Sequence, residues 1–226
     1  MHMTEGQGSV VVEREGLVAM FDLSPVEGVR KTDLDAIREV WDEDVYHLDG
    51  LDLTGQMAID LGAHIGAFAV RVALKGAQVL AVEPSPTNVE RLRAHIAANN
   101  LERVAVRAMA CGANSDDVGL AEMEGTGMLA RNDGSAVKFP CVTLIDLVAG
   151  VTIPGGSVLK IDTEGSEMAI LEGASDLLGE FDRIEIETHP MTRADAGLII
   201  ESLLWTHNVN WFGAIARGGM ISARRY

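Results

Sequence analysis

Ala58-Ile-Asp-Leu-Gly-Ala-His-Ile-Gly-Ala67 is the stretch of the sequence that decides the fold. The apolar run at residues 57–61 predicts a buried strand, and residues 65–74 have the pattern of a helix. Gly62 and Gly66 stand between them, where the lack of a side chain permits a tight turn and lets a ligand approach the backbone. The segment therefore predicts a strand, a glycine turn and a helix, with a ligand site at the turn.

The same alternation of strands and helices continues along the chain. Further strands are predicted at residues 78–82, 103–108, 158–161 and 183–187. Helices are predicted after Ser85, over residues 167–171, and from a cap at Thr192 to about Leu204, with a closing hairpin at 209–212 and 219–223. Such repetition predicts an α/β fold whose mostly parallel sheet has helices on both faces. In sheets of this kind ligands bind outside the carboxyl ends of the strands, so the site is expected there.

The length of 226 residues suits one compact domain, with two additions. Residues 1–54 are expected to form an N-terminal extension that packs on the core, with strands at 9–12 and 17–21 and a short helix capped by Thr32. Residues 55–226 form the Rossmann-like domain. An insertion at about residues 112–156, with strand-like pieces at 119–122 and 137–142, interrupts the alternation and is expected to recognise the substrate.

The acidic composition of the chain limits the kinds of partner that it is expected to bind. The 34 acidic and 18 basic residues give a formal net charge of −16, which disfavours nucleic acid and anionic membrane surfaces, because both attract Lys and Arg. Two cysteines do not make a disulfide framework, and no segment has the pattern of a signal peptide or a membrane span. We therefore expect a cytoplasmic protein without a nucleic acid or membrane partner; a homo-oligomer stays open.

The glycine turn has the form D-x-G-x-x-x-G, beginning at Asp60, rather than the G-x-G-x-x-G of dinucleotide sites. His64 stands at the middle glycine position, where a pyrophosphate would need the backbone very close. Glu83 ends the second strand, where an acid can bond the two ribose hydroxyls of an adenosine. The turn has no Lys or Arg, which favours S-adenosylmethionine, a phosphate-free sulfonium cation, over NAD. The alternative is that the glycines serve packing alone and that His64 only lines the loop.

Four further segments carry a resemblance to a known family. They are Val142-Thr-Leu144 followed by Asp146, Leu159-Lys-Ile-Asp-Thr-Glu-Gly165, Leu171-Glu-Gly173 and Ile184-Glu-Ile-Glu-Thr-His-Pro190. Together with the glycine turn and Val82-Glu-Pro84, they resemble the FkbM-type methyltransferases over roughly residues 40–190. The resemblance implies the class I methyltransferase fold with a seven-stranded sheet, S-adenosylmethionine as cofactor, and methylation of a hydroxyl group on a small molecule, sugar or natural product. One departure is Ile145, which separates Thr-Leu from the acid that the family places directly after it.

Carried over by position, the resemblance implies a cofactor site made by the glycine turn, the end of the second strand, the residue after the third strand and the acid after the fourth. Its members are Asp60, Gly62, Ala63, His64, Gly66, Glu83, Pro84, Ala110 and Asp162. Within this set the glycine turn would form the cofactor loop, Glu83 would hold the ribose and Ala110 would flank the adenine.

Candidate catalytic residues follow the fourth and fifth strands: Asp162, Glu164, Glu187 and His189. Adjacent strand ends put these groups over one cleft, and a hydroxyl nucleophile needs a base to take its proton. We expect one of them to be that base. Alternatively, Asp162 binds the cofactor's amino group, Glu164 stabilises the next helix, and the other two only position substrate. The Cys and His residues have no zinc spacing, so no metal site is expected.

Three functions remain open at this point. The first is an O-methyltransferase acting on a small-molecule or glycan hydroxyl. The second is a nucleotide-dependent oxidoreductase on the same fold, and the third is a cofactor-binding module without catalysis. In the extension, Trp41 is expected to pack, whereas Tyr46 either packs or covers the cofactor.

Overall fold

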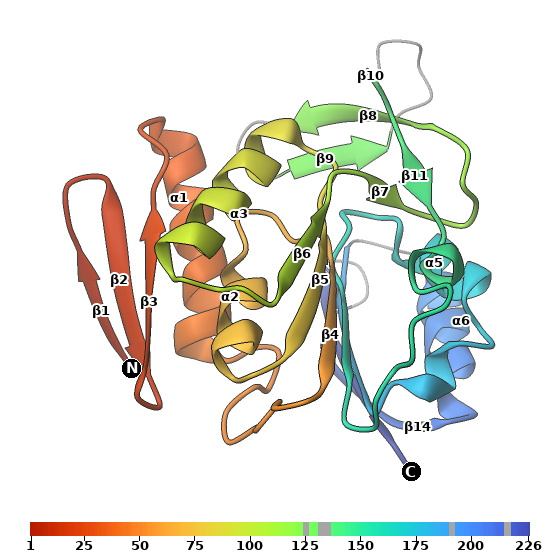
Figure 1. The fold of residues 1–226 in the computed structure, drawn as a ribbon. Helices are drawn as coiled ribbons and strands as arrows, with labels where there is room; N and C mark the ends of the chain where they lie inside the picture. Colours follow the sequence, from red (N-terminus) through yellow and green to blue (C-terminus); the bar gives the residue numbers. More distant parts are fainter. Residues whose placement is uncertain (124–126, 131–136, 190–192, 215–217) are drawn as a thin grey trace.

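The structure is a computed structural model that describes residues 1–226 except 124–126, 131–136, 190–192 and 215–217 (Figure 1). At its centre is a seven-stranded sheet with the order β14-β15-β13-β12-β4-β5-β6. Its strands are β4 (Met57–Leu61), β5 (Gln78–Val82), β6 (Val104–Arg107), β12 (Val158–Ile161), β13 (Arg183–Thr188), β14 (His207–Ala214) and β15 (Gly218–Arg225). β15 is antiparallel to both neighbours, and all pairs from β13 to β6 are parallel. The predicted mostly parallel, seven-stranded sheet is confirmed.

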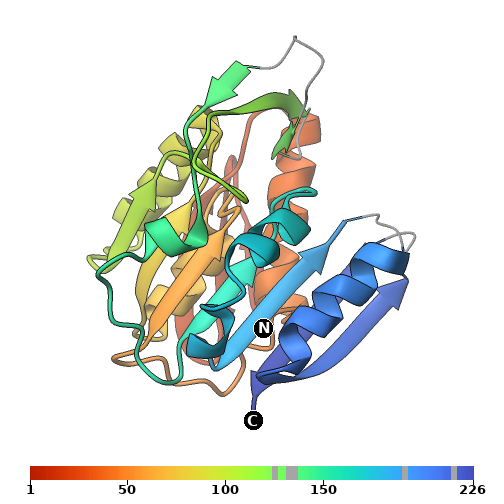
Figure 2. The ribbon, with the colours of Figure 1, turned by 90° about the vertical axis from the view of Figure 1, so that its right-hand side faces the viewer.

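Helices cover both faces of this sheet (Figures 1 and 2). On one side lie α1 (Glu27–Arg38), α2 (Ala67–Leu74) and α3 (Pro86–Ala98), and on the other α4 (Leu144–Leu147), α5 (Glu167–Gly173) and α6 (Arg193–Leu204), with the short 3₁₀ turn Leu178–Glu180. The apolar core accordingly consists of two clusters of buried side chains. Ala58 belongs to one cluster, while Ile59 and Leu61 belong to the other. This alternation follows from the strand period of two, which sends successive side chains to opposite faces. The predicted cap Thr192 lies outside the described residues.

The N-terminal residues form a small antiparallel sheet of β1 (His2–Glu5), β2 (Ser9–Arg14) and β3 (Leu17–Asp22), followed by α1 and the π-helix η1 (Glu39–Glu43). Trp41 is fully buried, and its indole N–H donates to the carbonyl of Ala67 at 3.2 Å. The predicted cap at Thr32 is wrong, because α1 begins five residues earlier, at Glu27. The hydroxyl of Thr32 instead donates to the carbonyl of Gly28, one turn back, as Ser and Thr do inside helices.

The insertion adds strands at the end of the sheet where β6 leads into β7 (Figure 1). Its strands β8 (Val118–Met123), β9 (Gly127–Ala130) and β10 (Val137–Phe139) form a three-stranded sheet. Its strand β11 (Cys141–Val142) pairs in parallel with β7 (Ala110–Cys111), which directly precedes the insertion. β8 corresponds to the strand-like piece predicted at 119–122, and β10 with β11 to that at 137–142. Among the described residues, no helix combines the length and the apolar character needed to cross a bilayer.

Candidate functional site

A cavity of about 240 Å³ lies at the carboxyl ends of the parallel strands. Residues that follow β4, β5, β6 and β12 line it, together with the end of β13 and residues of α1 and η1. Most of the predicted site residues are among those lining the cavity: Gly62, Ala63, His64, Glu83, Pro84, Ala110, Asp162, Glu164 and Glu187. Asp60, Gly66 and His189 were predicted too but do not line it. The cavity occupies the edge of the sheet where a ligand was expected.

Both glycines of the turn have a left-handed backbone conformation that favours glycine, and at Gly62 packing against the backbone also excludes a side chain. Gly62 has φ +78°, and a Cβ built on it would lie 1.6 Å from the carbonyl oxygen of Asp162 on the neighbouring strand. Gly66 has φ +91°, and its Cβ would lie 2.3 Å from Leu92. His64 also has a positive φ of 49°, and burial lowers its pKa to about 4, so the ring is neutral. The backbone conformation of the turn is therefore determined by the protein itself, without a contribution from a ligand.

Glu83 presents a fixed carboxylate to the cavity. One oxygen accepts the backbone N–H of His64 and the other that of Ser85, each at 2.9 Å. The residue is only 5% exposed, and burial raises its pKa in spite of these donors. Each carboxylate oxygen has two acceptor sites. The carboxylate thus keeps capacity for further hydrogen bonds while the loop holds its orientation.

Lys160 lies behind the turn and connects the strands. In the parallel register of β12 and β4, Lys160 stands opposite Asp60. Its ammonium donates to Asp60 Oδ1 and to the carbonyl of Gly62, both at 2.9 Å, and lies 3.3 Å from Asp162 Oδ2. Burial would lower the pKa of Lys160, yet Asp60 and Asp162 raise it overall. Asp60 therefore acts on the cavity through Lys160 and the turn rather than by lining it.

Glu187 and Tyr46 meet at the other side of Asp162. The phenol oxygen of Tyr46 is 3.2 Å from Glu187 Oε2 and 3.4 Å from Asp162 Oδ2. Burial, and then the charge of Asp162, raise the pKa of Glu187 to about 7. Burial likewise raises the pKa of Tyr46 well above its usual value. Glu187 therefore changes protonation state close to neutral pH, whereas Tyr46 keeps its proton.

His189 is clamped between two carboxylates. Nε2 is 3.0 Å from Glu164 and Nδ1 is 2.9 Å from Glu167, the buried first residue of α5. Burial would lower the pKa of His189, but these hydrogen bonds outweigh it and raise the pKa to about 11. The ring is thus protonated at neutral pH, and both of its nitrogens donate.

One group of side chains has the spacing of metal ligands. Ligand atoms of Asp162, Glu187 and His189 all lie within 4.8 Å of one another. A histidine binds a metal through a neutral ring nitrogen. Since both nitrogens of His189 already donate to Glu164 and Glu167, the group favours an ion-pair network over a metal centre.

Sequence reasoning missed three residues of the site. Lys160, a cation inside the buried four-residue strand β12, could have been found from the acid expected in the neighbouring strand. Tyr46 was left undecided between packing and covering the cofactor, and the structure places it in the lining. Glu39, on the π-helix, also lines the cavity, and burial raises its pKa. Nothing in the sequence pattern distinguishes it from the other acids of the extension.

Comparison with known proteins adds a family to this geometry. The family model described as the methyltransferase FkbM domain matches residues 60–209, which is more than half of the chain. That range contains the glycine turn, Glu83, the acids after β12 and Glu187 near the end of β13, but not Tyr46. No curated protein matches the sequence significantly.

Solved structures share the fold at low sequence identity. A magnesium protoporphyrin IX methyltransferase from Synechocystis with bound S-adenosylmethionine has a TM-score of 0.52 at 14% identity, over 90% of this chain and 86% of that one. A candidate methyltransferase from Streptococcus mutans, in complex with S-adenosylhomocysteine, has a TM-score of 0.54 at 9% identity, over 82% and 97%. A candidate rRNA methylase from Clostridium thermocellum has 0.52 at 8%, over 81% and 96%. The predicted class I methyltransferase fold is confirmed.

Proposed function

The chain belongs to the FkbM methyltransferase family, and from that premise we propose that it transfers a methyl group from S-adenosylmethionine to a hydroxyl group of a small molecule, a sugar or a natural product. The observation that carries the proposal is the carboxyl group of Glu187, which faces the cavity beside Asp162 at the end where the fold places its ligands.

The cavity suits a cationic methyl donor. Six acidic residues line it, whereas Lys160 is its one lysine or arginine among the described residues, and it is already paired with Asp60. A phosphate-bearing dinucleotide would be repelled by this arrangement, and a sulfonium cation is attracted by it. Glu83 is placed to hold the ribose hydroxyls with a carboxylate whose orientation His64 and Ser85 fix. These features favour S-adenosylmethionine over the nicotinamide alternative.

Among the predicted bases, the geometry favours Glu187. His189 donates from both ring nitrogens and has no lone pair free for a proton. Glu164 is committed to His189, and Asp162 to Lys160. Glu187 keeps its proton equilibrium near pH 7, where a general base is most efficient. The carboxylate of Glu187 is therefore assigned the role of taking the proton from the substrate hydroxyl.

The chemistry requires few steps from the protein. S-adenosylmethionine supplies a methyl carbon bound to a positively charged sulfur, which a nucleophile attacks in line. The protein holds the hydroxyl oxygen behind that carbon, and such orientation contributes up to about 7–11 kcal/mol. As the new C–O bond forms, the bond between the methyl carbon and the sulfur would break and leave S-adenosylhomocysteine, while the hydroxyl proton passes to Glu187, which later releases it to water. A positioned base of this kind adds typically ~10²–10⁴-fold in rate.

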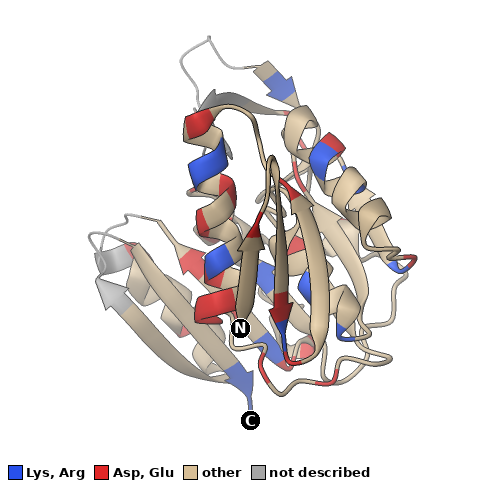
Figure 3. Cartoon of the chain, turned by 90° about the vertical axis from the view of Figure 1, so that its left-hand side faces the viewer, with Lys and Arg blue, Asp and Glu red and all other residues tan. Residues whose placement is uncertain are grey.

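A small hydroxylated substrate is favoured over nucleic acid on electrostatic grounds. RNA methylases share this fold, so the fold itself does not distinguish the two substrates. In the view of Figure 3, Lys and Arg are spread over several elements and alternate with Asp and Glu. With a net charge of −16, the protein offers little to neutralise phosphates.

The test combines calorimetry with a transfer assay. Titration with S-adenosylhomocysteine is expected to give binding, and protein incubated with methyl-labelled S-adenosylmethionine is then offered monosaccharides, hydroxylated natural products and transcribed RNA. Label is expected on a hydroxyl oxygen of the first two groups, and Glu187→Gln is expected to slow transfer about 10²–10⁴-fold without loss of binding. The absence of any binding, or label on RNA alone, would refute the proposal.

A further inference from the structure

Tyr46 reaches the reacting edge of the cavity from outside the segment that matches the family. It lies between η1 and β4, and the matched range begins at residue 60. The side chain is 3% exposed, and its ring packs edge-on against Phe68 with centroids 5.3 Å apart. The hydroxyl thereby comes within 3.2 Å of Glu187 and 3.4 Å of Asp162.

We propose that Tyr46 is a positioning residue for the proposed base: its hydroxyl donates a hydrogen bond to Glu187, and the buried Arg71 holds the loop that carries Tyr46 in place. The inference rests on the proposed function, which assigns the proton transfer to Glu187. This loop comprises residues 44–49.

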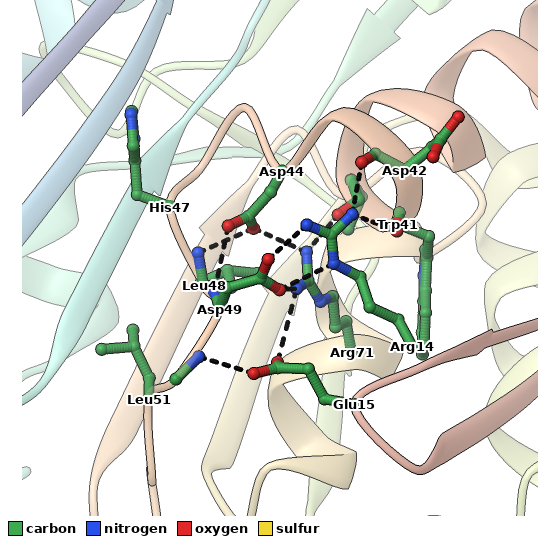
Figure 4. A network of polar contacts seen from close by, with 12 residues as sticks. Arg14, Glu15, Trp41, Asp42, Asp44, His47, Leu48, Asp49, Leu51 and Arg71 are labelled. Carbon is green, nitrogen blue, oxygen red and sulfur yellow. Dashed lines mark hydrogen bonds and ion pairs between the residues drawn. The ribbon is translucent and has the colours of Figure 1, made fainter. Parts of the chain in front are cut away.

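Arg71 fastens this loop to the Rossmann-like core (Figure 4). Its side chain is 1% exposed, and its guanidinium donates to Asp44 at 2.7 Å, to Asp49 at 2.5 Å and to the carbonyl of Val40. Arg14, from the N-terminal sheet, binds the same Asp49. A planar guanidinium presents five donors in a fixed fork, so one buried side chain can fix several acceptors at once. The loop is thus bound to α2 on one side and to β2 on the other.

The backbone of residues 44–49 has an unfavourable conformation at two positions, which hydrogen bonds and ion pairs stabilise. Asp44 and His47, which flank Tyr46 closely, have φ values of 55° and 52°. Left-handed backbone at residues with side chains is unfavourable and persists where surrounding contacts determine it. Asp44 supplies those contacts, since its carboxylate accepts the backbone N–H of Leu48 at 2.8 Å and of Asp49 at 3.0 Å. Tyr46 therefore sits on a rigid support.

The hydroxyl of Tyr46 has one proton to donate, and Glu187 is a better acceptor for it than Asp162. Asp162 already has the ammonium of Lys160 at 3.3 Å, and the Tyr46 oxygen is closer to Glu187 than to Asp162. The charged groups that act on Glu187 are Asp162, directly after β12, Lys160 of β12, Glu39 of η1 and His189 beyond β13. Because the acids disfavour the carboxylate form of Glu187, a donor that stabilises this form has a direct effect on its protonation.

The phenol keeps its proton because burial, Asp162 and Glu187 raise the pKa of Tyr46 far above neutrality. It is consequently a donor throughout the working range. When Glu187 takes the substrate proton, the O–H bond of the substrate breaks and a carboxylic O–H bond forms, while the Tyr46 proton stays on its own oxygen. Tyr46 thus orients the accepting oxygen without being consumed.

The test measures the titration of Glu187 directly, so it needs no substrate. Protein labelled with ¹³C at the glutamate carboxyl carbon is followed by NMR between pH 4 and pH 10, and the Glu187 signal is identified by its loss in Glu187→Gln. In Tyr46→Phe the midpoint of this signal is expected to move upward by about one pH unit, since a lost charge-assisted hydrogen bond disfavours the carboxylate. Arg71→Lys, which cannot span the same acceptors, is expected to move it in the same direction by less.

Tyr226→Phe is the matched control. It removes the same hydroxyl at a residue that is 75% exposed and bonded to the carbonyl of Leu204, and it should leave the midpoint unchanged. An unchanged or lower midpoint in folded Tyr46→Phe would overturn the inference. Should Tyr46→Phe fail to fold by circular dichroism, Arg71→Lys decides alone. If the unaltered protein does not bind the cofactor, the proposed function is wrong. The titration would still show whether Tyr46 affects the protonation of Glu187.

Discussion

Lys160→Met is the most informative single substitution, because it leaves the buried carboxylate of Asp60 without its charged partner. Asp60 is completely buried, and the ammonium of Lys160 at 2.9 Å is its one charged partner among the described residues. Methionine matches the length of the lysine side chain and removes the charge. The substitution also removes the donor to the carbonyl of Gly62, at 2.9 Å, and so loosens the turn of the cofactor loop.

The expected magnitude follows from the burial of Asp60. Removing one partner of a buried ion pair costs about 3–5 kcal/mol of unfolding free energy, a large share of a total of about 5–15 kcal/mol. Burial already raises the pKa of Asp60, and Lys160 opposes that rise, so the pKa of Asp60 rises further in the variant. A group whose pKa is higher in the folded than in the unfolded state loses stability as the pH rises. The penalty should therefore grow between pH 5 and pH 8, by at most about 1.4 kcal/mol per pH unit.

Urea unfolding of the variant and the unaltered protein at pH 5, 6.5 and 8 measures this difference. Asp60→Asn combined with Lys160→Met is the control, since it removes both charges and should recover much of the stability at pH 8. A penalty that is below about 1 kcal/mol, or that is equal at pH 5 and pH 8, would refute the reasoning. Either result would mean that Asp60 is solvated or otherwise paired in the folded protein.

Two further outcomes are expected. Glu83→Gln should weaken binding of S-adenosylhomocysteine about 10–100-fold by calorimetry, because the ribose hydroxyls lose a charged acceptor; unchanged affinity would contradict the assignment. Treatment with EDTA should leave both cofactor binding and methyl transfer intact, because His189 uses both ring nitrogens on Glu164 and Glu167; activity that is lost and then restored by Mg²⁺ or Mn²⁺ would place a metal at Asp162, Glu187 and His189.

The sheet and its helices could be predicted because each depends on short-range patterns. The buried strands β4, β5 and β12 are apolar runs, and α3 begins as expected, with Ser85 accepting the N–H of Asn88 and proline at the first position. Alternation of such elements leaves few topologies for a mostly parallel sheet. Thr32 shows the limit of this reasoning, since the same hydroxyl suits a cap and a helix interior, and here it lies inside α1.

The cavity lining at the strand ends was predictable for the same topological reason. Parallel strands end at one edge, so the acids after β12 and at the end of β13 had to approach the glycine turn. What the topology does not determine is which acid is paired. Our proposal of Glu187 as base in place of His189 depends on Glu167, whose carboxylate at the start of α5 bonds to the ring. The choice of Glu187 depends on the depth of its burial, which no local pattern gives.

Tyr46 could not be assigned because its position depends on contacts between residues far apart in the sequence. Its partners Asp162 and Glu187 follow it by 116 and 141 positions. A signal was nevertheless present in α2, where Arg71 interrupts an otherwise apolar helix with the sequence AFAVRVAL. An arginine on a helix that must be buried on most sides requires acidic partners, and the extension offers them just before and after Tyr46. A buried cation in a core helix thus marks the segment that folds over the site, even where that segment has no motif.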